Sequence, residues 1–292
     1  MKLGYSGSSD NLEEVLLAAA TRAVSYLRSA FVSSEAVKLG EGGDVTRRFD
    51  EVAERIILNT LKEYLGDVKV VSEEVGVIGS GSWLAIVDPV DGSANFEAGI
   101  PIASVSIGLA RASENARVRD IVAGIVAEVF RDAIYYFDKD GGFKAIGVRA
   151  RRRSPPADVV LGYFESLESY TPFLELSKLL GRRLKLRSLG SAALDIVYVA
   201  LGSALGFLDA RAKLRNVDVA AALSIASSLG AKAYLCEGVD ALELELARLS
   251  KVKCLVVGYD EATARTILEA VNISKSWERT SRDTPPEPFP LL

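Results

Sequence analysis

The sequence predicts an α+β N-terminal domain with an antiparallel sheet over residues 1–153, followed by an α/β domain over residues 154–275. In the first part, two helical patterns precede strand patterns joined by turn residues, which is typical of an antiparallel meander. In the second part, strand and helix patterns alternate, and such alternation places helices over a mixed or parallel sheet. Residues 276–292 are polar and proline-rich, so we expect a loose C-terminal tail.

Two amphipathic helices open the chain. Apolar side chains recur at helical spacing over residues 12–30, with Asp10 as the predicted N-cap, and over residues 52–64, with Asp50 as the predicted N-cap. The connection between the two helices is glycine-rich and ends in a carboxylate at Asp44. Taken alone, this connection is a flexible loop with a capping aspartate.

Strand patterns follow the two helices. Residues 68–72 are rich in valine and predict a short strand, and Glu73 and Glu74 come directly after it. The basic run at residues 149–156, RARRRSPP, can bind phosphates or RNA, but its proline pair between two strand patterns favours a solvated linker between domains. The strands of the predicted meander cover residues 102–111, 120–130 and 133–137.

The second domain is predicted as helices that cover a mixed or parallel sheet. Its predicted strands cover residues 158–164, 184–189, 205–209, 232–236 and 252–257. Its predicted helices cover residues 168–180, 191–201, 217–229 and 260–274.

Composition excludes several classes of protein. Histidine is absent, so catalysis by Ser-His-Asp, Cys-His, phosphohistidine or HExxH sites is excluded, and any hydrolysis must depend on carboxylates and metal. The net charge of −4 argues against nucleic acid or an anionic membrane as partner. No apolar run approaches the ~18 residues of a membrane span. Residues 1–9 lack a signal-peptide core, so we expect a cytoplasmic protein.

Cys236 and Cys254 both lie in apolar, strand-like runs. We expect them to be small core residues in a reducing cytosol rather than a disulfide or a reactive pair. Glutamine is absent, cysteine and methionine are scarce and charged residues are abundant, which fits a thermophilic source.

The stretch at residues 86–101, IVDPVDGSANFEAGIP, combines features of a metal site and of a phosphate site. An apolar strand ends in the run 88–92, where proline fixes the backbone between two aspartates and glycine permits a bend. Both carboxylates and the Val90 carbonyl can converge on one point, and hard oxygens without histidine or thiolate suit Mg²⁺, Mn²⁺ or Ca²⁺. Ser93 can open a short helix whose free amides would receive a phosphate. The alternative is a surface turn after an edge strand.

The longer string DPVDGSANFxxGIP resembles the D-P-[IL]-D-G-[TS]-x-N-F-x-x-G-x-P signature of the inositol monophosphatase and fructose-1,6-bisphosphatase superfamily. Further segments resemble this family in order and spacing. They are the G-D-x-T-x-x-x-D-x-x-A-E run from Gly43, the pair that begins with Glu73, the G-S-A-A run from Gly190 and the D-V-A-A run from Asp218. The departure is Val217, where the family has an aromatic residue.

The resemblance implies a layered α/β/α/β/α sugar-phosphatase fold, a homodimer, and hydrolysis of a phosphate monoester by metal-activated water. It implies two or three Mg²⁺ per site, with Mn²⁺ able to substitute. Without it, Asp44 and Asp218 would be helix caps and Glu73 a solvated strand end. The implied metal ligands are Glu73, Asp88, the Val90 carbonyl, Asp91 and Asp218. The implied catalytic residues are Glu73, Ser93 and Asp44. The implied substrate contacts are Gly92, Ser93, Ser191 and Ala192, to which we add Arg211 and Lys213.

The segment 209–218, DARAKLRNVD, bears on the choice of substrate. Archaeal family members that hydrolyse both inositol-1-phosphate and fructose-1,6-bisphosphate look similar here. Arg211 and Lys213 would then hold a second phosphate. Alternatively, these residues and Arg215 solvate a strand-to-helix loop or pair with nearby acids. We expect both substrates. A 3′-phosphoadenosine-type nucleotide phosphatase and a non-enzymatic dimeric regulator remain the alternatives.

Overall fold

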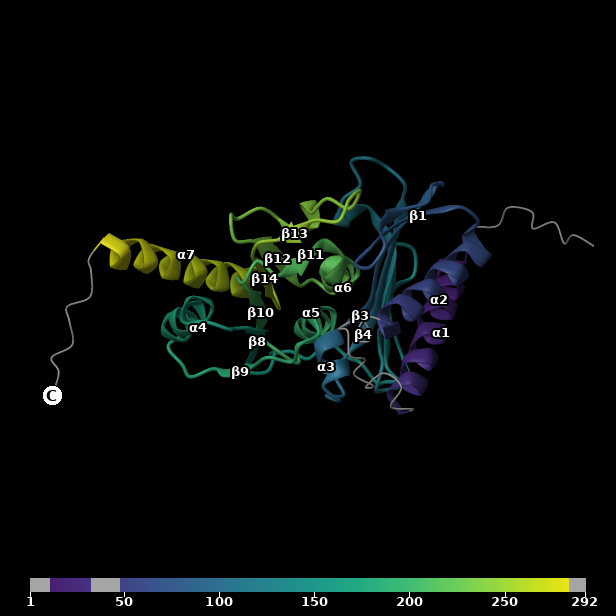
Figure 1. Cartoon of the computed structure of the whole chain (residues 1–292). Helices are drawn as coiled ribbons and strands as arrows, with labels where there is room; N and C mark the ends of the chain where they lie inside the picture. The colour runs from purple at the N-terminus through teal and green to yellow at the C-terminus, as the bar shows by residue number, and fades with distance from the viewer. Residues whose placement is uncertain (1–10, 33–47, 284–292) are drawn as a thin grey trace, which may run out of the picture.

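Helical layers and sheets alternate in the computed structural model, which describes residues 11–32 and 48–283 (Figure 1). Helices α1 (Leu12–Val32) and α2 (Arg48–Leu65) cover one face of a large sheet. Helices α5 (Ala192–Ala200) and α6 (Asn216–Ser228) lie between this sheet and a smaller one. Helices α4 (Leu167–Leu179) and α7 (Glu261–Asp283) pack on each other, and α7 covers the outer face of the smaller sheet. This arrangement confirms the layered α/β/α/β/α fold.

The large sheet has seven strands in the order β2-β1-β3-β4-β5-β6-β7. Strands β1 and β3 are parallel and every other neighbouring pair is antiparallel, so the predicted meander is confirmed. Sequence patterns missed β2 and β7, which are short and carry partly or fully exposed side chains. The strands are β1 (Val68–Ser72), β2 (Gly76–Ile78), β3 (Trp83–Asp91), β4 (Ser104–Arg111), β5 (Ile121–Glu128), β6 (Ile134–Asp138) and β7 (Gly142–Ile146).

The smaller sheet has five strands in the order β12-β14-β10-β8-β9 and mixes parallel with antiparallel pairs, as predicted. A separate two-stranded ladder pairs β11 with β13. The helix expected over 260–274 continues to Asp283, so the segment that we predicted as a tail begins as helix. The remaining elements are α3 (Ser93–Glu97), β8 (Val159–Tyr163), β9 (Lys185–Arg187), β10 (Gly206–Asp209), β11 (Leu214–Arg215), β12 (Lys232–Leu235), β13 (Lys251–Val252), β14 (Leu255–Gly258) and the 3₁₀ turns Val118–Asp120 and Ala241–Glu243.

The N-termini of the first two helices differ from the predicted caps. The predicted cap of α1, Asp10, lies outside the described residues, and the Asn11 side chain accepts a hydrogen bond from the Glu14 amide instead. Helix α2 begins at Arg48, so Asp50 lies within its first turn and is buried. The prediction of Asp50 as a cap is therefore wrong, because the helix starts three residues earlier than this cap implies and buries the carboxylate.

Helix α6 approaches the large sheet at a pair of glycines. Gly108 on β4 pairs with Gly124 on β5, and a Cβ on either would lie 3.5–3.7 Å from the nearest atoms of Ala221. A side chain larger than the methyl group of alanine at either glycine would push α6 away from the sheet. Since Asp218 lies one turn before Ala221, these glycines help to set the distance between the Asp218 carboxylate and β3.

The run of basic residues between β7 and β8 is a connection held at one point. The Arg152 guanidinium stacks 3.9 Å from the centre of the Tyr259 ring and donates hydrogen bonds to the carbonyls of Ala200 and Tyr259. Arg151 and Arg153 are exposed. The division into domains at residue 153 stays a prediction, because the central core contains buried residues from both sides of it.

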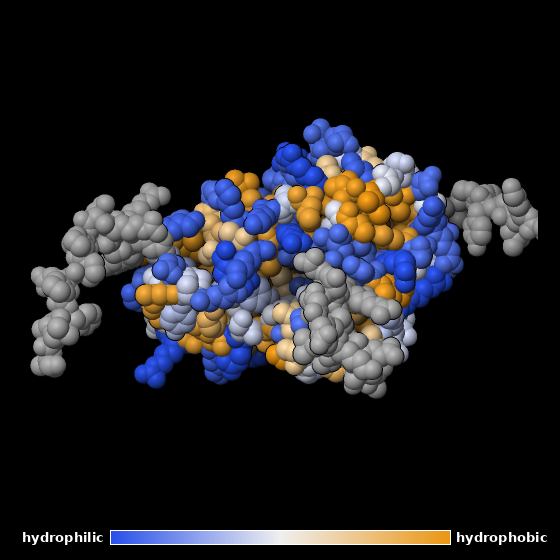
Figure 2. Space-filling view, in the orientation of Figure 1, coloured by the Kyte–Doolittle hydropathy of each residue, from blue (hydrophilic) through white to orange (hydrophobic). Residues whose placement is uncertain are grey.

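Hydrophilic residues cover most of the face in Figure 2, and hydrophobic residues form separate patches on it. In the described part of the chain, none of the helices has the length and apolar character that a membrane span requires.

Cys236 and Cys254 form a disulfide, so the prediction of two separate thiols is wrong. Strand β12 runs antiparallel to β14 with Leu235 opposite Leu255, which brings the two cysteines within 5.4 Å between Cα atoms. Sequence patterns could identify both strands but could not show that they are neighbours. Intracellular disulfides are also less rare in hyperthermophiles than in mesophiles.

Reduction of this disulfide should lower the stability of the protein. The bond links residues 18 positions apart, and closing a loop of that size contributes about 3 kcal/mol. We expect a lower denaturation midpoint in excess dithiothreitol, and a similar loss in the Cys236→Ser, Cys254→Ser double variant, whose midpoint should not respond to dithiothreitol. Equal midpoints for the oxidised and reduced wild type would contradict this prediction.

Candidate active site

Three carboxylates from separate elements converge beside the end of β3. Oxygens of Glu73, Asp88 and Asp218 all lie within 4.8 Å of one another. Glu73 follows β1, Asp88 lies on β3 and Asp218 lies in the first turn of α6. The neighbouring positions of β1 and β3 in the large sheet and the packing of α6 on β3 bring them together. The choice of Glu73 rather than Glu74 agrees with this cluster.

A β-bulge places the two aspartates of β3 on one face of the sheet. Asp88 pairs with Ser106 and Asp91 pairs with Ser104, so three steps along β3 match two along β4. Residues three apart in a regular strand point to opposite faces, and the extra residue cancels this alternation. We expected the strand to stop before Asp88, but it continues through the bulge to Asp91.

The Asp91 carboxylate binds the N-terminus of α5. Its Oδ1 accepts a hydrogen bond from the Ala192 amide at 2.9 Å. Its Oδ2 accepts one from the Ala193 amide at 2.9 Å and others from the hydroxyls of Ser104 and Ser191. These bonds satisfy free amides of α5 with a negative charge. Since Oδ1 has a single partner here, it keeps a lone pair for a cation.

Asp218 acts as a helix cap and also faces the carboxylate cluster. Its Oδ2 accepts a hydrogen bond from the Arg215 amide at 2.9 Å, while its Oδ1 is buried without a hydrogen-bond partner. The capping and metal-binding interpretations of this residue are therefore compatible, because each uses a different oxygen. A buried carboxylate oxygen without a donor is a suitable ligand for a cation.

Two further residues, Glu54 and Arg215, support Glu73. The buried Glu54 carboxylate accepts hydrogen bonds from the Ser72 hydroxyl and from the backbone amides of Glu74 and Val75, which fixes the turn after β1. The Arg215 guanidinium forms an ion pair with Glu73 at 2.8 Å. Arg215 thus supplies positive charge beside the cluster.

Burial and mutual repulsion raise the pKa values of these acids. Burial, followed by the charges of Asp91, Asp218 and Glu73, raises the pKa of Asp88 well above its usual range. Burial raises the pKa of Asp91 to about 6, against the lowering effect of its hydrogen bonds. Burial raises the pKa of Asp218 to about 7. A divalent cation would remove this repulsion, so the donor set fits Mg²⁺.

Asp50 is a candidate site residue that the sequence analysis missed. It is buried, its Oδ1 has no hydrogen-bond partner, and burial with the charges of Glu74 and Glu73 raises its pKa to about 8. The available signal was its place as the second aspartate of the G-D-x-T-x-x-x-D run that begins at Gly43. Asp44, the first aspartate of that pattern, lies outside the described residues.

The turn after β3 has the predicted form. Gly92 adopts φ 94°, and a Cβ there would lie 2.9 Å from the carbonyl oxygens of Ile102 and Gly190. Ser93 then begins α3, and the Asn95 side chain donates hydrogen bonds to the carbonyls of Ile102 and Leu189. These contacts hold the start of α3 beside the start of α5. The roles of Gly92, Ser93, Ser191 and Ala192 toward a substrate stay predictions.

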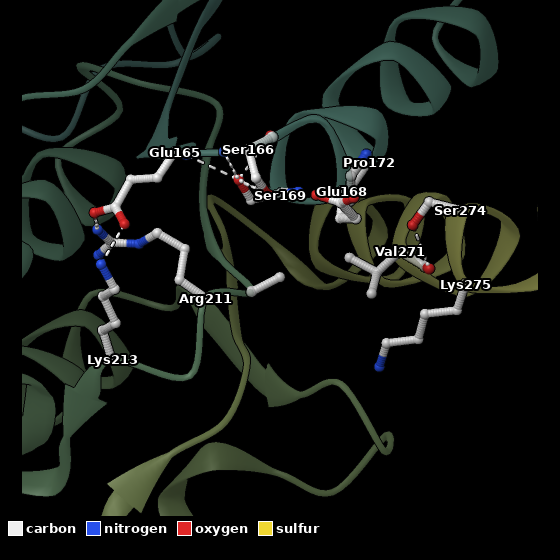
Figure 3. A pocket seen from close by; sticks show the side chains of 11 residues that line it. Glu165, Ser166, Glu168, Ser169, Pro172, Arg211, Lys213, Val271, Ser274 and Lys275 are labelled. Carbon is white, nitrogen blue, oxygen red and sulfur yellow. Dashed lines mark hydrogen bonds and ion pairs between the residues drawn. The ribbon is translucent and has the colours of Figure 1, made fainter. Parts of the chain in front are cut away.

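Arg211 and Lys213 pair with acids in this structure, as the alternative interpretation expected. Arg211 binds Asp209 through two nitrogens and stacks 4.3 Å from the centre of the Tyr163 ring. Both basic side chains also pair with Glu165, beside a pocket of about 460 Å³ formed by α4, α7 and the segment after β10 (Figure 3). Their contact with a second phosphate stays a prediction.

Comparison with known proteins identifies relatives that match most of the chain. The family model described as "Inositol monophosphatase family" matches residues 8–275. An "Inositol-1-monophosphatase" of Aeropyrum pernix is 33% identical over 263 residues, which cover 88% of this chain and 96% of the relative. A "Fructose-1,6-bisphosphatase/inositol-1-monophosphatase" of Thermococcus kodakarensis is 36% identical over 240 residues, which cover 82% and 88%.

Solved structures agree with these relatives. A Pyrococcus horikoshii protein described as having similarities to inositol-1 monophosphatase superposes with a TM-score of 0.70 at 26% identity, covering 90% of this chain and 99% of that chain. The extragenic suppressor protein suhB of Bartonella henselae superposes with a TM-score of 0.71 at 25% identity, covering 89% and 98%.

Asp218→Asn should stabilise the metal-free protein at alkaline pH. The pKa of Asp218 is about 7 in the fold against an ordinary 3.8, so the folded state holds a proton that the unfolded chain releases. Folding stability is therefore lost as pH rises from about 4 to 7. Each pKa unit corresponds to ~1.4 kcal/mol, and ~1 kcal/mol shifts the melting temperature of a chain this size by about 2 °C.

We expect the melting temperature of the variant in a chelator to exceed that of the wild type by several degrees at pH 8 and to match it at pH 4. Addition of Mg²⁺ should raise the melting temperature of the wild type more than that of the variant. If the variant melts at or below the melting temperature of the wild type in chelator at pH 8, ionised Asp218 does not destabilise the metal-free fold.

Proposed function

Because the chain belongs to the inositol monophosphatase family, we propose that it is a Mg²⁺-dependent phosphoric monoester hydrolase acting on inositol-1-phosphate and fructose-1,6-bisphosphate. The observation that carries this proposal is the cluster of Glu73, Asp88 and Asp218, with the buried Asp218 Oδ1 free of donors. The first substrate is named for the Aeropyrum pernix relative and both for the Thermococcus kodakarensis relative.

Two or three Mg²⁺, or Mn²⁺ in their place, would be held by the predicted ligands. Glu73, Asp88 and the Val90 carbonyl would hold one ion, and Asp88, Asp91 and Asp218 a second. The Val90 side chain is buried in the core, so its carbonyl is the group available to the site. When bound, the ions would activate a water for in-line attack on phosphorus and stabilise the leaving alkoxide.

The chain's own groups would orient the reaction. Glu73 and the Ser93 hydroxyl would hold the attacking water, and the amides of Gly92 and Ser93 would donate to phosphate oxygens. Asp91 supports this geometry from behind, since its bonds to Ala192 and Ala193 fix α5 against the turn. Asp44 is proposed as a further catalytic acid on the strength of the resemblance alone.

A nucleotide phosphatase remains the second candidate function. A "Bifunctional NADP phosphatase/NAD kinase" of Methanococcus maripaludis is 27% identical over 218 residues, covering 68% of this chain and 38% of that protein. A panel of inositol-1-phosphate, fructose-1,6-bisphosphate, adenosine 3′,5′-bisphosphate and NADP, each with Mg²⁺, separates the candidates. If none of these compounds releases phosphate, the result would favour a non-enzymatic dimeric regulator.

We further propose that the phosphatase is a cytoplasmic homodimer.

Asp88→Asn should reduce turnover by several orders of magnitude because it removes a ligand shared by two cations. The fold should survive, since the variant removes a buried charge and keeps an acceptor for the Val90 amide. Phosphate release and melting temperature should be measured together in Mg²⁺. A folded variant with near-normal Mg²⁺-dependent turnover would mean that the metal site is wrongly assigned.

Removal of Lys213 or Arg211 should affect the bisphosphate more than the monophosphate. A charge-assisted contact to phosphate is worth roughly 1.5–3 kcal/mol, so Arg211→Ala should lower kcat/KM for fructose-1,6-bisphosphate by about 10- to 100-fold. For inositol-1-phosphate, kcat/KM should change by less than about threefold.

Lys213→Ala is the milder variant, because Lys213 is 61% exposed and its removal leaves the pair between Arg211 and the buried Asp209 in place. If kcat/KM falls equally for both substrates, Arg211 and Lys213 only support the structure of the segment before Asp218.

A further inference from the structure

Glu165 forms ion pairs with Arg211 and Lys213. These are the two basic residues that would bind a second phosphate in the proposed function. Glu165 follows β8, and its carboxylate oxygens pair separately with the Arg211 guanidinium and the Lys213 ammonium (Figure 3). One carboxylate thus bridges two cations from another loop, 46 and 48 residues away. A phosphate group presents oxygens to guanidinium and ammonium groups in a similar way.

Arg211 does not depend on Glu165 for its position. The buried Asp209 binds the Arg211 backbone amide, Nε and one terminal nitrogen, all at 2.9–3.0 Å. The guanidinium also stacks on the Tyr163 ring, and the Arg211 side chain is only 16% exposed. Glu165 binds the remaining terminal nitrogen, which is the part of the guanidinium left for another partner. Arg211 is therefore a fixed donor whose outer edge can exchange ligands.

Glu165 itself can leave at small cost. Its side chain is 49% exposed, and exposed ion pairs contribute about 0–1 kcal/mol each. It lines the 460 Å³ pocket, which offers solvated space for a displaced side chain. Lys213 and then Arg211 lower the pKa of Glu165, so the acid keeps its charge and its hold on both cations at neutral pH.

We propose that Glu165 competes with the distal phosphate of a bisphosphate substrate for Arg211 and Lys213, and so sets the preference between bisphosphate and monophosphate substrates. This inference depends on the proposed function. In the unliganded enzyme Glu165 neutralises both cations, and a bisphosphate must displace it. A substrate without a second phosphate leaves the contact intact.

The test compares Glu165→Gln with the wild type on both substrates at one saturating Mg²⁺ concentration. The amide keeps the size of the side chain and loses its charge. We expect KM for fructose-1,6-bisphosphate to fall about fivefold with kcat unchanged, as a displaced pair of ~1 kcal/mol predicts. The kinetic constants for inositol-1-phosphate should stay within about twofold.

Asp158→Asn is the matched control. It removes an exposed acid that pairs with Arg182 at 2.8 Å, at the opposite end of β8. It should leave KM for both substrates unchanged, which separates a local effect from a change in net charge. Melting temperatures of both variants should match the wild type closely.

The possible outcomes distinguish this inference from the proposed function. One outcome would overturn the role of Glu165 and leave the proposed function standing. In it, Lys213→Ala lowers kcat/KM for the bisphosphate selectively, while Glu165→Gln leaves KM for the bisphosphate unchanged or raises it. Equal losses on both substrates in Arg211→Ala and Lys213→Ala would remove the second-phosphate site, and the role of Glu165 with it. A lower KM for both substrates in Glu165→Gln would indicate general electrostatic attraction and would also overturn the inference.

Discussion

The burial of several carboxylates against one another is the constraint on which the proposed site depends. Asp88 and Asp91 are buried, and it costs free energy to move ionised carboxylates out of water and place them side by side. Asp91 is compensated by donors from α5 and from Ser104, and Glu73 by Arg215. Asp88 receives a hydrogen bond from the Val90 amide, and its pKa stays raised well above the usual range. A cation would relieve the most repulsion at Asp88.

The same contacts join the two halves of the chain. Asp91 binds the N-terminus of α5, and Asn95 binds the Leu189 carbonyl just before it. The turn after β3 is therefore held against an element about 100 residues later in the sequence. A change at this turn would disturb both the carboxylates and the packing of the middle helical layer. Binding of a cation and the stability of the fold are consequently coupled.

The sequence could predict what depends on local pattern and on motif, and little that depends on register or on which strands are neighbours. Alternation of strands and helices predicted the helices that cover the smaller mixed sheet, and the resemblance implied the layered fold. The DPVDG string predicted a turn at which glycine permits the bend. The bulge between Asp88 and Asp91 follows from pairing with β4, which no local pattern reveals. The Cys236–Cys254 disulfide likewise depends on the adjacency of β12 and β14. Asp50 was assigned as a cap because the start of α2 was placed three residues late.

The two interpretations of the basic segment before α6 describe different parts of it. The pair between Asp209 and Arg211 is shielded from solvent and uses several geometrically matched hydrogen bonds, so it fixes the arginine as part of the fold. The contacts of Glu165 are exposed and can exchange for a ligand of the same charge. Ion pairing in the unliganded protein is therefore no argument against a binding role. A preformed donor set needs a counter-charge until its ligand arrives, and the strength of that counter-charge limits how tightly the ligand is held.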